Sequence, residues 1–208
     1  MLKLDFYFSP GSRYSYLAMS QVPLIEKRFS VKFDWLPVSS MRIRVLRGVD
    51  PFAKSPVSGH PVSEQYDWNY RREDAERWAA VYNIPFTESH GFDFDLLVRA
   101  AIVARLLGDT RTYASELTSE VYARETGPLD ASLCKDVAVR ANLNAAEFEA
   151  LLESPQAYEA TEAAAVEAIK RGVFGVPTFF IGGKRFWGND RLILVEHELS
   201  RMQVTPQQ

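Results

Sequence analysis

The 208-residue sequence predicts an α/β fold in which a small β-sheet is interrupted by a large all-helical insertion. Three observations lead to this expectation. The chain begins with a strand, a helix and a second strand; its middle part has almost only helical periodicity; and its end contains two short strands followed by a helix. The predicted order is therefore βαβ, a helical block, and ββα.

The opening βαβ unit is indicated by two changes of period. The stretch "LKLDFYF" alternates, with Leu4 and Phe6 on one face, as in a strand. From Ser12 onward the apolar residues follow helical spacing, and a serine at this point is a natural N-cap. The stretch "VKFDWLPV" alternates again. Because crossovers between parallel strands are right-handed with strong preference, this unit fixes the hand of the sheet.

The middle of the chain divides into a loop and a helical block. Residues 37–63 have no clear period and contain several prolines, which predicts a long loop with a short helix near Met41 to Leu46. Helical patterns such as "EDAERWAAVY" and "FDLLVRAAIVARLL" then recur up to Arg171. Turn signals such as Gly108-Asp109 and Ser154-Pro155 separate them.

The C-terminal part supplies the remaining strands. Thr178 to Ile181 and Lys184 to Trp187 are expected to pair through a tight turn at Gly182-Gly183. Asn189 or Asp190 is expected to cap the last helix. The apolar positions of that helix are Leu192, Val195, Leu199 and Met202.

A ββα unit can add its two strands to the sheet that the βαβ unit begins. The sequence thus predicts a thioredoxin-like fold with a large all-helical insertion. We expect residues 1–63 and 172–208 to form the thioredoxin-like domain and residues 64–171 to form the helical insertion subdomain.

Composition narrows the classes of function. The chain has 24 basic and 27 acidic residues and a net charge of −3, without a basic stripe, so we expect no nucleic-acid partner. Cys134 is the only cysteine, which excludes an intrachain disulfide and a Cys-x-x-Cys redox pair. The histidines His60, His90 and His197 lack metal-ligand spacing, so no metal is expected.

The location expected from the sequence is cytoplasmic. The stretch "MLKLDFYF" begins a strand and lacks the charged head and apolar core of a signal peptide. No apolar run approaches the ~20 residues that span a bilayer, and "AAIVARLL" is broken by Arg105. No membrane partner is therefore expected.

The stretch "PGSRYSYLA" places Ser12 and Ser15 three residues apart at the first turn of the predicted helix. Thiol–disulfide enzymes place two cysteines at this spacing. Ser15 is expected to be an exposed first-turn serine. Together, "DFYFSPGSRYSYLA" and "GVFGVPTFFIGGKRFWGNDRL" resemble 2-hydroxychromene-2-carboxylate isomerases and kappa-class glutathione transferases, which are disulfide-oxidoreductase-A-like members of the thioredoxin superfamily.

The resemblance implies a glutathione site. Ser12 aligns with the family serine that hydrogen-bonds the glutathione thiolate, at a helix N-terminus whose N–H groups and partial positive charge favour an anion. Pro177 resembles the family's cis-proline, which leaves the backbone of Val176 to pair with the tripeptide. Asn189 and Asp190 align with the positions that receive its γ-glutamyl end.

The activity that the resemblance implies is a glutathione-dependent isomerisation of an aromatic-degradation intermediate, with glutathione as cofactor and a small aromatic or unsaturated carboxylate as substrate. Two alternatives stay open: a kappa-like glutathione S-transferase, and a non-catalytic thioredoxin-like binding protein. The family also implies a homodimer. We further expect the helical block to pack over the glutathione site.

The sequence departs from the family pattern at positions that bear on the substrate. Arg13 stands where a proline usually follows the serine, Asp67 stands where a lysine is usual, and an Asn-Lys-Pro-Pro stretch is replaced by "AKSPVSGHP". Tyr14, Trp68 and Trp187 are candidates to line an aromatic substrate site.

Overall fold

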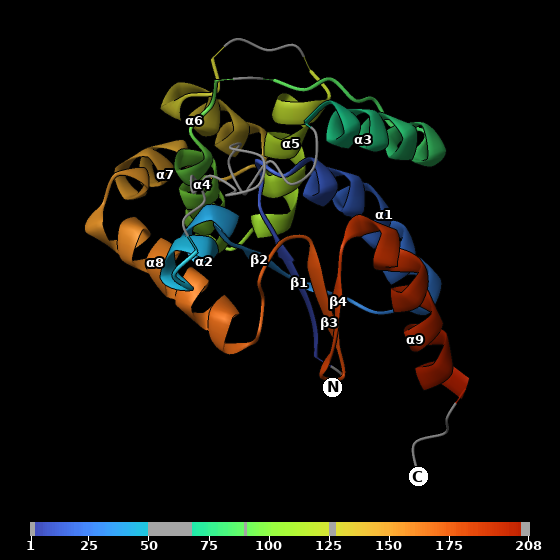
Figure 1. Cartoon of the computed structure of the whole chain (residues 1–208). Coiled ribbons are helices and arrows are strands. Elements are labelled where there is room, and N and C mark those ends of the chain that lie inside the picture. Colours follow the sequence, from blue (N-terminus) through green and yellow to red (C-terminus); the bar gives the residue numbers. More distant parts are fainter. Residues whose placement is uncertain (1–2, 50–67, 90, 125–127, 205–208) are drawn as a thin grey trace.

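The computed structural model describes residues 3–49, 68–89, 91–124 and 128–204, and the statements below concern these residues. A mixed four-stranded sheet of order β2-β1-β3-β4 lies at the centre (Figure 1). Its strands are β1 (Leu4–Phe8), β2 (Asp34–Pro37), β3 (Thr178–Ile181) and β4 (Lys184–Trp187). β1 runs parallel to β2 and antiparallel to β3, which pairs antiparallel with β4. The predicted thioredoxin-like α/β fold is confirmed.

One face of the sheet is covered by α1 (Arg13–Phe29) and α9 (Leu192–Val204). The alternation of β1 turns Phe6 and Phe8 toward these helices, and both side chains are fully buried. The helical spacing predicted for the last helix buries Leu192, Val195 and Leu199 as expected. Met202 differs, because its side chain is 37% exposed at the end of that helix.

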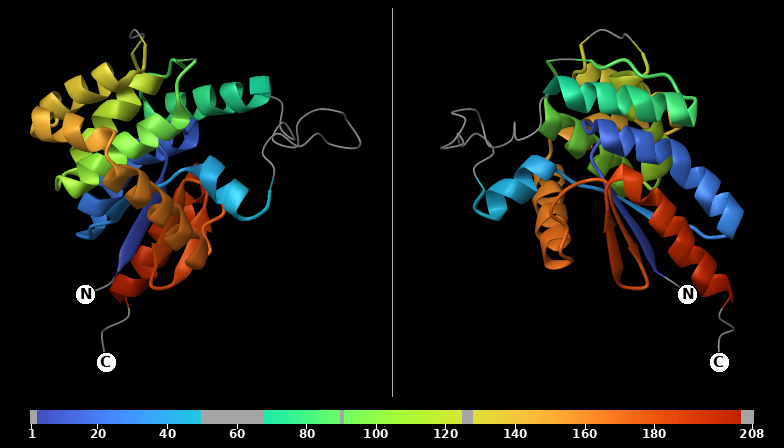
Figure 2. Two further views of the ribbon diagram at one scale, coloured as in Figure 1. Left: turned by 90° about the vertical axis from the view of Figure 1, so that its left-hand side faces the viewer. Right: turned by 45° about the vertical axis from the view of Figure 1, so that its right-hand side comes forward.

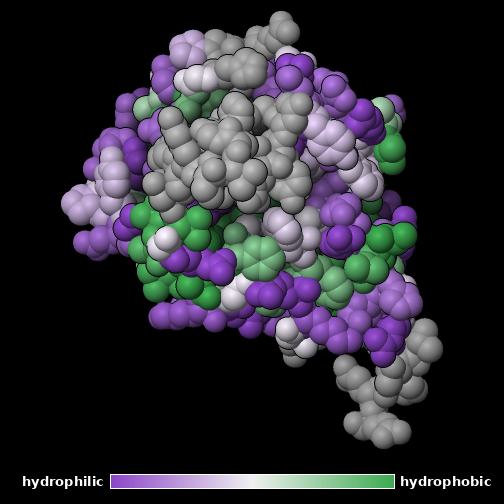
Figure 3. Space-filling model, in the orientation of Figure 1, coloured by the Kyte–Doolittle hydropathy of each residue, from purple (hydrophilic) through white to green (hydrophobic). Residues whose placement is uncertain are grey.

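The opposite face is covered by α2 (Ser40–Leu46) and α8 (Pro155–Lys170), as Figure 2 shows. Ala165 and Ala168 of α8 pack with Tyr7 and Phe180, which point to this side. The short helix expected near Met41 to Leu46 is confirmed as α2. Its outer side keeps exposed apolar residues, and Figure 3 shows hydrophobic side chains gathered over this helix.

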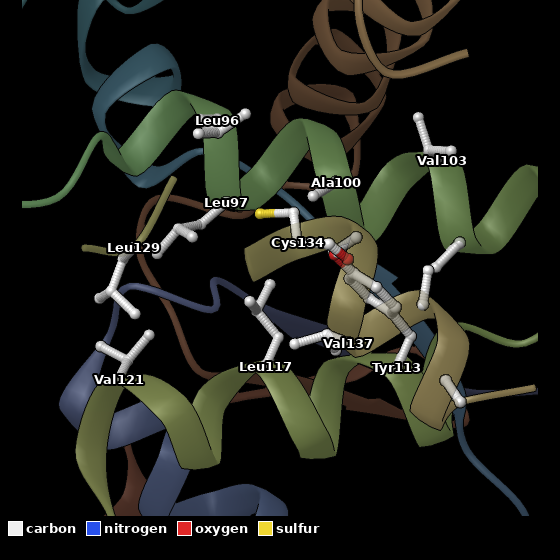
Figure 4. Packing of buried hydrophobic residues seen from close by; sticks show 14 of the residues in the cluster. Leu96, Leu97, Ala100, Val103, Tyr113, Leu117, Val121, Leu129, Cys134 and Val137 are labelled. Atoms are coloured by element: carbon white, nitrogen blue, oxygen red, sulfur yellow. The ribbon is translucent and has the colours of Figure 1, made fainter. Parts of the chain in front are cut away.

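The remaining helices form a layer beyond one end of the sheet. They are α3 (Trp68–Tyr82), α4 (Phe94–Leu106), α5 (Thr110–Tyr122), α6 (Ala131–Arg140) and α7 (Ala145–Leu152). Each helical pattern expected between residues 64 and 171 corresponds to a helix. Figure 4 shows Leu97, Leu117 and Cys134 directed into the space between α4, α5 and α6, where all three are fully buried.

The helical layer and the sheet are joined through α1. Tyr16 and Leu17 of this helix belong to the hydrophobic cluster of the helical layer, whereas Ala18 and Val22 belong to the cluster on the sheet. In addition, α8 falls within the predicted insertion by sequence but packs on the sheet. The division into residues 1–63 with 172–208 and residues 64–171 stays a prediction.

None of the helices that the structure describes has the length and the apolar character needed to cross a lipid bilayer.

Candidate functional site

The candidate site begins at the turn after β1. Ser12 is the N-cap of α1, and its Oγ accepts a hydrogen bond of 3.3 Å from the backbone N–H of Ser15. Ser12 is half-buried, and among the described residues its own O–H has no acceptor. The first turn of α1 carries no acidic residue. A hydroxyl donor therefore stands at a helix N-terminus that favours an anion.

Ser15 is not the exposed first-turn serine that the sequence suggested. Its side chain is fully buried, and its Oγ accepts a 3.3 Å hydrogen bond from the backbone N–H of Ser9. The N–H of Ser12 donates to the carbonyl of Ser9 at 3.0 Å. Ser15 thus stabilises the turn between Ser9 and Ser12, which positions Ser12 at the start of α1.

Pro177 forms a cis peptide bond with Val176, as the sequence predicted. The antiparallel pairing of β1 with β3 ends at Tyr7 and Thr178, so Val176 and Pro177 immediately precede the paired part of β3. Val176 is half-buried, and among the described residues neither its N–H nor its C=O has a hydrogen-bond partner. A short extended peptide could therefore pair here as an added strand.

The turn after β4 lies beside the cis-proline, because the N–H of Gly188 donates to the carbonyl of Pro177 at 3.0 Å. Asn189 opens a 3₁₀ turn and is 2% exposed, with its Oδ1 accepting a 3.3 Å hydrogen bond from the hydroxyl of Tyr82. Its Nδ2 has no partner in the described part of the chain. Asp190 is exposed, and its carboxylate lies 3.3 Å from Arg191.

Neither side chain at positions 189 and 190 caps α9 as expected from the sequence, because the chain enters this helix through the 3₁₀ turn without a side-chain cap. Asn189 is anchored to α3 through Tyr82 instead. The exposed carboxylate of Asp190 remains available to a cationic group of a ligand.

The unusual Arg13 is buried rather than exposed to a ligand. Its Nη2 lies 2.5 Å from Oε1 of Glu88, and both side chains are mostly excluded from solvent. Glu88 belongs to the connection between α3 and α4. The cation that replaces the family's proline is therefore neutralised within the protein and ties this connection to the start of α1.

The helical layer reaches the same turn through residues that the sequence analysis did not identify. The hydroxyl of Tyr122 donates a 2.6 Å hydrogen bond to the carbonyl of Gly11. A Cβ atom at Gly11 would lie 2.4 Å from Cδ1 of Phe94 and 3.1 Å from Cε2 of Phe92. The stretch "GFDFD" was the available signal, because it alternates aromatic and acidic residues across the start of α4. Helices α4 and α5 thus contact the turn that carries Ser12, and the packing of the helical block over a glutathione site stays a prediction.

The aromatic candidates from the sequence take separate places. The hydroxyl of Tyr14 donates to Oδ2 of Asp74 on α3 at 2.8 Å, and burial together with this carboxylate raises the pKa of Tyr14 to about 12. Trp187 is half-exposed and meets the ring of Phe174 edge-on at 4.9 Å. Asp67 and the side chain of Trp68 lie outside the described residues.

These groups together could receive a short peptide that carries a thiolate and an ammonium group. A hydroxyl and a helix N-terminus suit a thiolate, the free backbone of Val176 suits a peptide, and the carboxylate of Asp190 suits an ammonium group. Within the described ranges, no three His, Cys, Asp or Glu side chains gather as a possible metal site.

The chain is similar to known proteins over almost its whole length. The family described as the DSBA-like thioredoxin domain matches residues 3–200. The chain is 27% identical to the 2-hydroxychromene-2-carboxylate isomerase of Pseudomonas putida over 200 residues, which cover 96% of this chain and 95% of that protein. It is 28% identical to the protein of the same name from Sphingobium xenophagum, over 94% of this chain and 97% of that one.

A solved structure of a 2-hydroxychromene-2-carboxylate isomerase superposes with a TM-score of 0.82 at 27% identity, covering 96% of this chain and 95% of that chain. The likeness extends over both the sheet and the helical layer.

Proposed function

The chain belongs to the DSBA-like thioredoxin domain family, and on this premise we propose that it is a glutathione-dependent isomerase of the 2-hydroxychromene-2-carboxylate type. The two relatives and the solved structure compared above match almost its whole length and carry that name. The observation that carries the proposal is Ser12, a hydroxyl at the N-terminus of α1 where redox members of such folds need a thiol. A chain without a second cysteine needs its sulfur from a ligand.

We propose that the cis-proline region and the turn after β4 hold the tripeptide. The N–H and C=O of Val176 would pair with its central peptide groups beside Pro177, and Asp190 would receive its ammonium group. Asn189 would hold the turn that carries Asp190 in place, because its buried side chain is hydrogen-bonded by Tyr82. These contacts would orient the thiol toward Ser12.

Bound glutathione would supply a thiolate that adds to an unsaturated bond of the substrate and leaves again after rotation about that bond, so that glutathione is not consumed. Ser12 would donate its O–H to this thiolate while its Oγ keeps the N-cap bond from Ser15. A hydrogen bond to a charged group contributes roughly 1.5–3 kcal/mol. This corresponds to a lowering of the thiol pKa by about one to two units, to which the helix N-terminus adds.

The test has two stages that separate this proposal from its alternatives. Calorimetric titration of glutathione into the full chain should show binding at one site per chain. Incubation with 2-hydroxychromene-2-carboxylate should then yield isomerised product while the amount of free glutathione stays constant. Glutathione lost in proportion to product would instead identify a kappa-like transferase. No glutathione binding would leave a non-catalytic thioredoxin-like binding protein.

We also propose that the chain forms a homodimer, as the family resemblance implies. Light scattering across a wide concentration range should give twice the mass of the 23.6 kDa chain. A constant monomer mass would contradict this.

A further inference from the structure

We infer that the ring of Phe94, supported by Phe92, forms the surface against which the aromatic ring of the substrate lies. The inference rests on the proposed function and adds a specificity-determining residue to it. It is carried by the position of Phe94 at the turn that presents Ser12 and by the exposure of its ring.

The ring of Phe94 lies against the backbone of Gly11, the residue before Ser12. Only a glycine leaves this space, because a Cβ there would lie 2.4 Å from Cδ1 and 2.8 Å from Cε1 of Phe94. The ring centroids of Phe92 and Phe94 are 4.6 Å apart with their planes inclined by 53°. The pair therefore forms one aromatic surface against the backbone of the residue that precedes Ser12.

The ring of Phe94 is also free to meet a ligand. It is 45% exposed, whereas Phe92 behind it is half-buried and packs against the core of the helical layer. An exposed aromatic ring offers its face to another aromatic ring, in an offset or edge-on arrangement. A flat unsaturated substrate placed over Ser12 would cover this exposed area.

The position of the pair is fixed by contacts to both sides of the Ser12 turn. The connection that leads to Phe92 is held to α1 by the ion pair of Arg13 and Glu88. It is also held to the end of α5, because the N–H of Thr87 donates to the carbonyl of Tyr122 at 2.7 Å. The hydroxyl of Tyr122 also donates to the carbonyl of Gly11. The end of α5 therefore holds both the connection that leads to Phe92 and the turn that carries Ser12.

The charges around Phe94 indicate which end of the substrate lies here. Asp93 caps α4, accepting a 2.8 Å hydrogen bond from the N–H of Asp95, and Asp95 accepts one of 3.1 Å from Ser39. The carboxylates of Asp93 and Asp95 flank Phe94 in the chain and would repel the carboxylate of the substrate. The ring of the substrate should therefore lie over Phe94, and its carboxylate should point away from α4.

The test measures binding of two stable probes to the full chain loaded with glutathione. Coumarin-3-carboxylate carries a flat aromatic ring and a carboxylate, whereas maleate is unsaturated and lacks the ring. Phe94→Ala should weaken coumarin-3-carboxylate binding about tenfold and change maleate binding less than twofold. Phe94→Tyr should retain the affinity for coumarin-3-carboxylate, because it keeps the ring.

The matched control is Leu106→Ala. Leu106 is the last residue of α4, Phe94 is the first, and both side chains are 45% exposed. The control should leave both affinities unchanged. The inference is overturned if the glutathione-loaded chain does not bind coumarin-3-carboxylate, or if Phe94→Ala binds both probes as the unsubstituted chain does. If the unsubstituted chain does not bind glutathione, both the proposed function and this inference are overturned. If it binds glutathione but gives one of the two results above, only this inference is overturned.

Discussion

The hydroxyl of Tyr122 donates a hydrogen bond of 2.6 Å to the carbonyl oxygen of Gly11, one residue before Ser12. The ring of Tyr122 is 1% exposed, and burial raises its pKa above the ordinary value, so the hydroxyl remains a donor at any physiological pH. Through this bond the last turn of α5 holds the backbone that begins α1. The helical layer is thereby coupled directly to the candidate site.

Tyr122→Phe should lower the free energy of unfolding by about 1–3 kcal/mol, because it leaves the buried carbonyl of Gly11 without its donor. It should also raise the pKa of a bound glutathione thiol, since the turn that carries Ser12 loses a support. Urea denaturation measures the first effect, and the absorbance of the thiolate as a function of pH measures the second.

The control for this substitution is Tyr113→Phe. Tyr113 is also fully buried, and its hydroxyl also donates to a backbone carbonyl, that of Cys134, at 3.1 Å. It should lose similar stability without a change of the thiol pKa. If the two variants have equal thiol pKa values, the bond to Gly11 does not hold the serine turn in its working position.

Ser12→Ala should leave glutathione affinity nearly unchanged, because the proposed peptide contacts lie at Val176 and Asp190. The thiol pKa should rise and kcat should fall by roughly ten- to a hundredfold or more, at ~1.4 kcal/mol for each factor of ten. In Ser12→Cys the new thiolate is expected to attack added glutathione disulfide, form a mixed disulfide with one half and release the other half as glutathione, which mass spectrometry would detect.

Ser154→Ala separates this effect from the loss of a helix cap. Ser154 caps α8, and its Oγ accepts from the N–H of Ala157 at 3.3 Å, the same distance and spacing as for Ser12 and Ser15. Each alanine should cost about 0.5–2 kcal/mol of stability. If Ser12→Ala changes neither the pKa of the bound thiol nor the turnover, Ser12 serves only as a helix N-cap and the proposed mechanism is wrong.

The strands and helices could be predicted because each has its own spacing of apolar residues, which can be seen within a short stretch of the sequence. The alternation around Phe6 and the helical spacing of the middle part gave the elements, but a period does not name the surface that an element covers. The placement of α8 on the sheet is decided by small residues such as Ala165 and Ala168 meeting Tyr7, which lies more than a hundred residues away.

The candidate site was predictable only where a continuous motif carries it. Ser12 and the cis bond of Pro177 came from such motifs, and the cis bond is confirmed. The contacts of Gly11 with Tyr122 and Phe94 join distant segments and have no local pattern. The burial of Ser15 was missed for a similar reason, because its acceptor role depends on how the preceding turn folds back.

Asp190→Asn should weaken glutathione binding about three- to tenfold, because it removes the charge that would pair with the ligand's ammonium group in an exposed position. A glutathione analogue without the amino group should bind equally to the variant and to the unsubstituted chain. Calorimetry checks both. Asp136→Asn, an exposed aspartate on α6, should leave the affinity unchanged.

An equal affinity of Asp190→Asn for glutathione and for the analogue lacking the amino group is the expected signature of this pairing. If the variant still prefers glutathione as strongly as the unsubstituted chain does, the ammonium group is bound elsewhere.

Cys134 predicts how stability depends on alkaline pH. The thiol is fully buried between α4, α5 and α6, and burial raises its pKa from about 9 to about 11. Between these values the unfolded chain has released the proton and the folded chain still holds it. The unfolded state therefore binds fewer protons, so stability that is fully present below pH 9 is lost as the pH rises toward 11.

The loss attributable to Cys134 should reach about 1 kcal/mol at pH 10. Urea denaturation between pH 8 and 10 measures it, and this window limits the contribution of tyrosines, whose ordinary pKa lies near 10. Cys134→Ala creates a cavity and lowers stability at every pH, so the comparison concerns the slope with pH. The variant should have the flatter slope, and the unsubstituted chain should react with a disulfide reagent only as fast as it unfolds. Equal slopes together with rapid reaction of the folded chain would show that the thiol is accessible and that its burial does not control its ionisation.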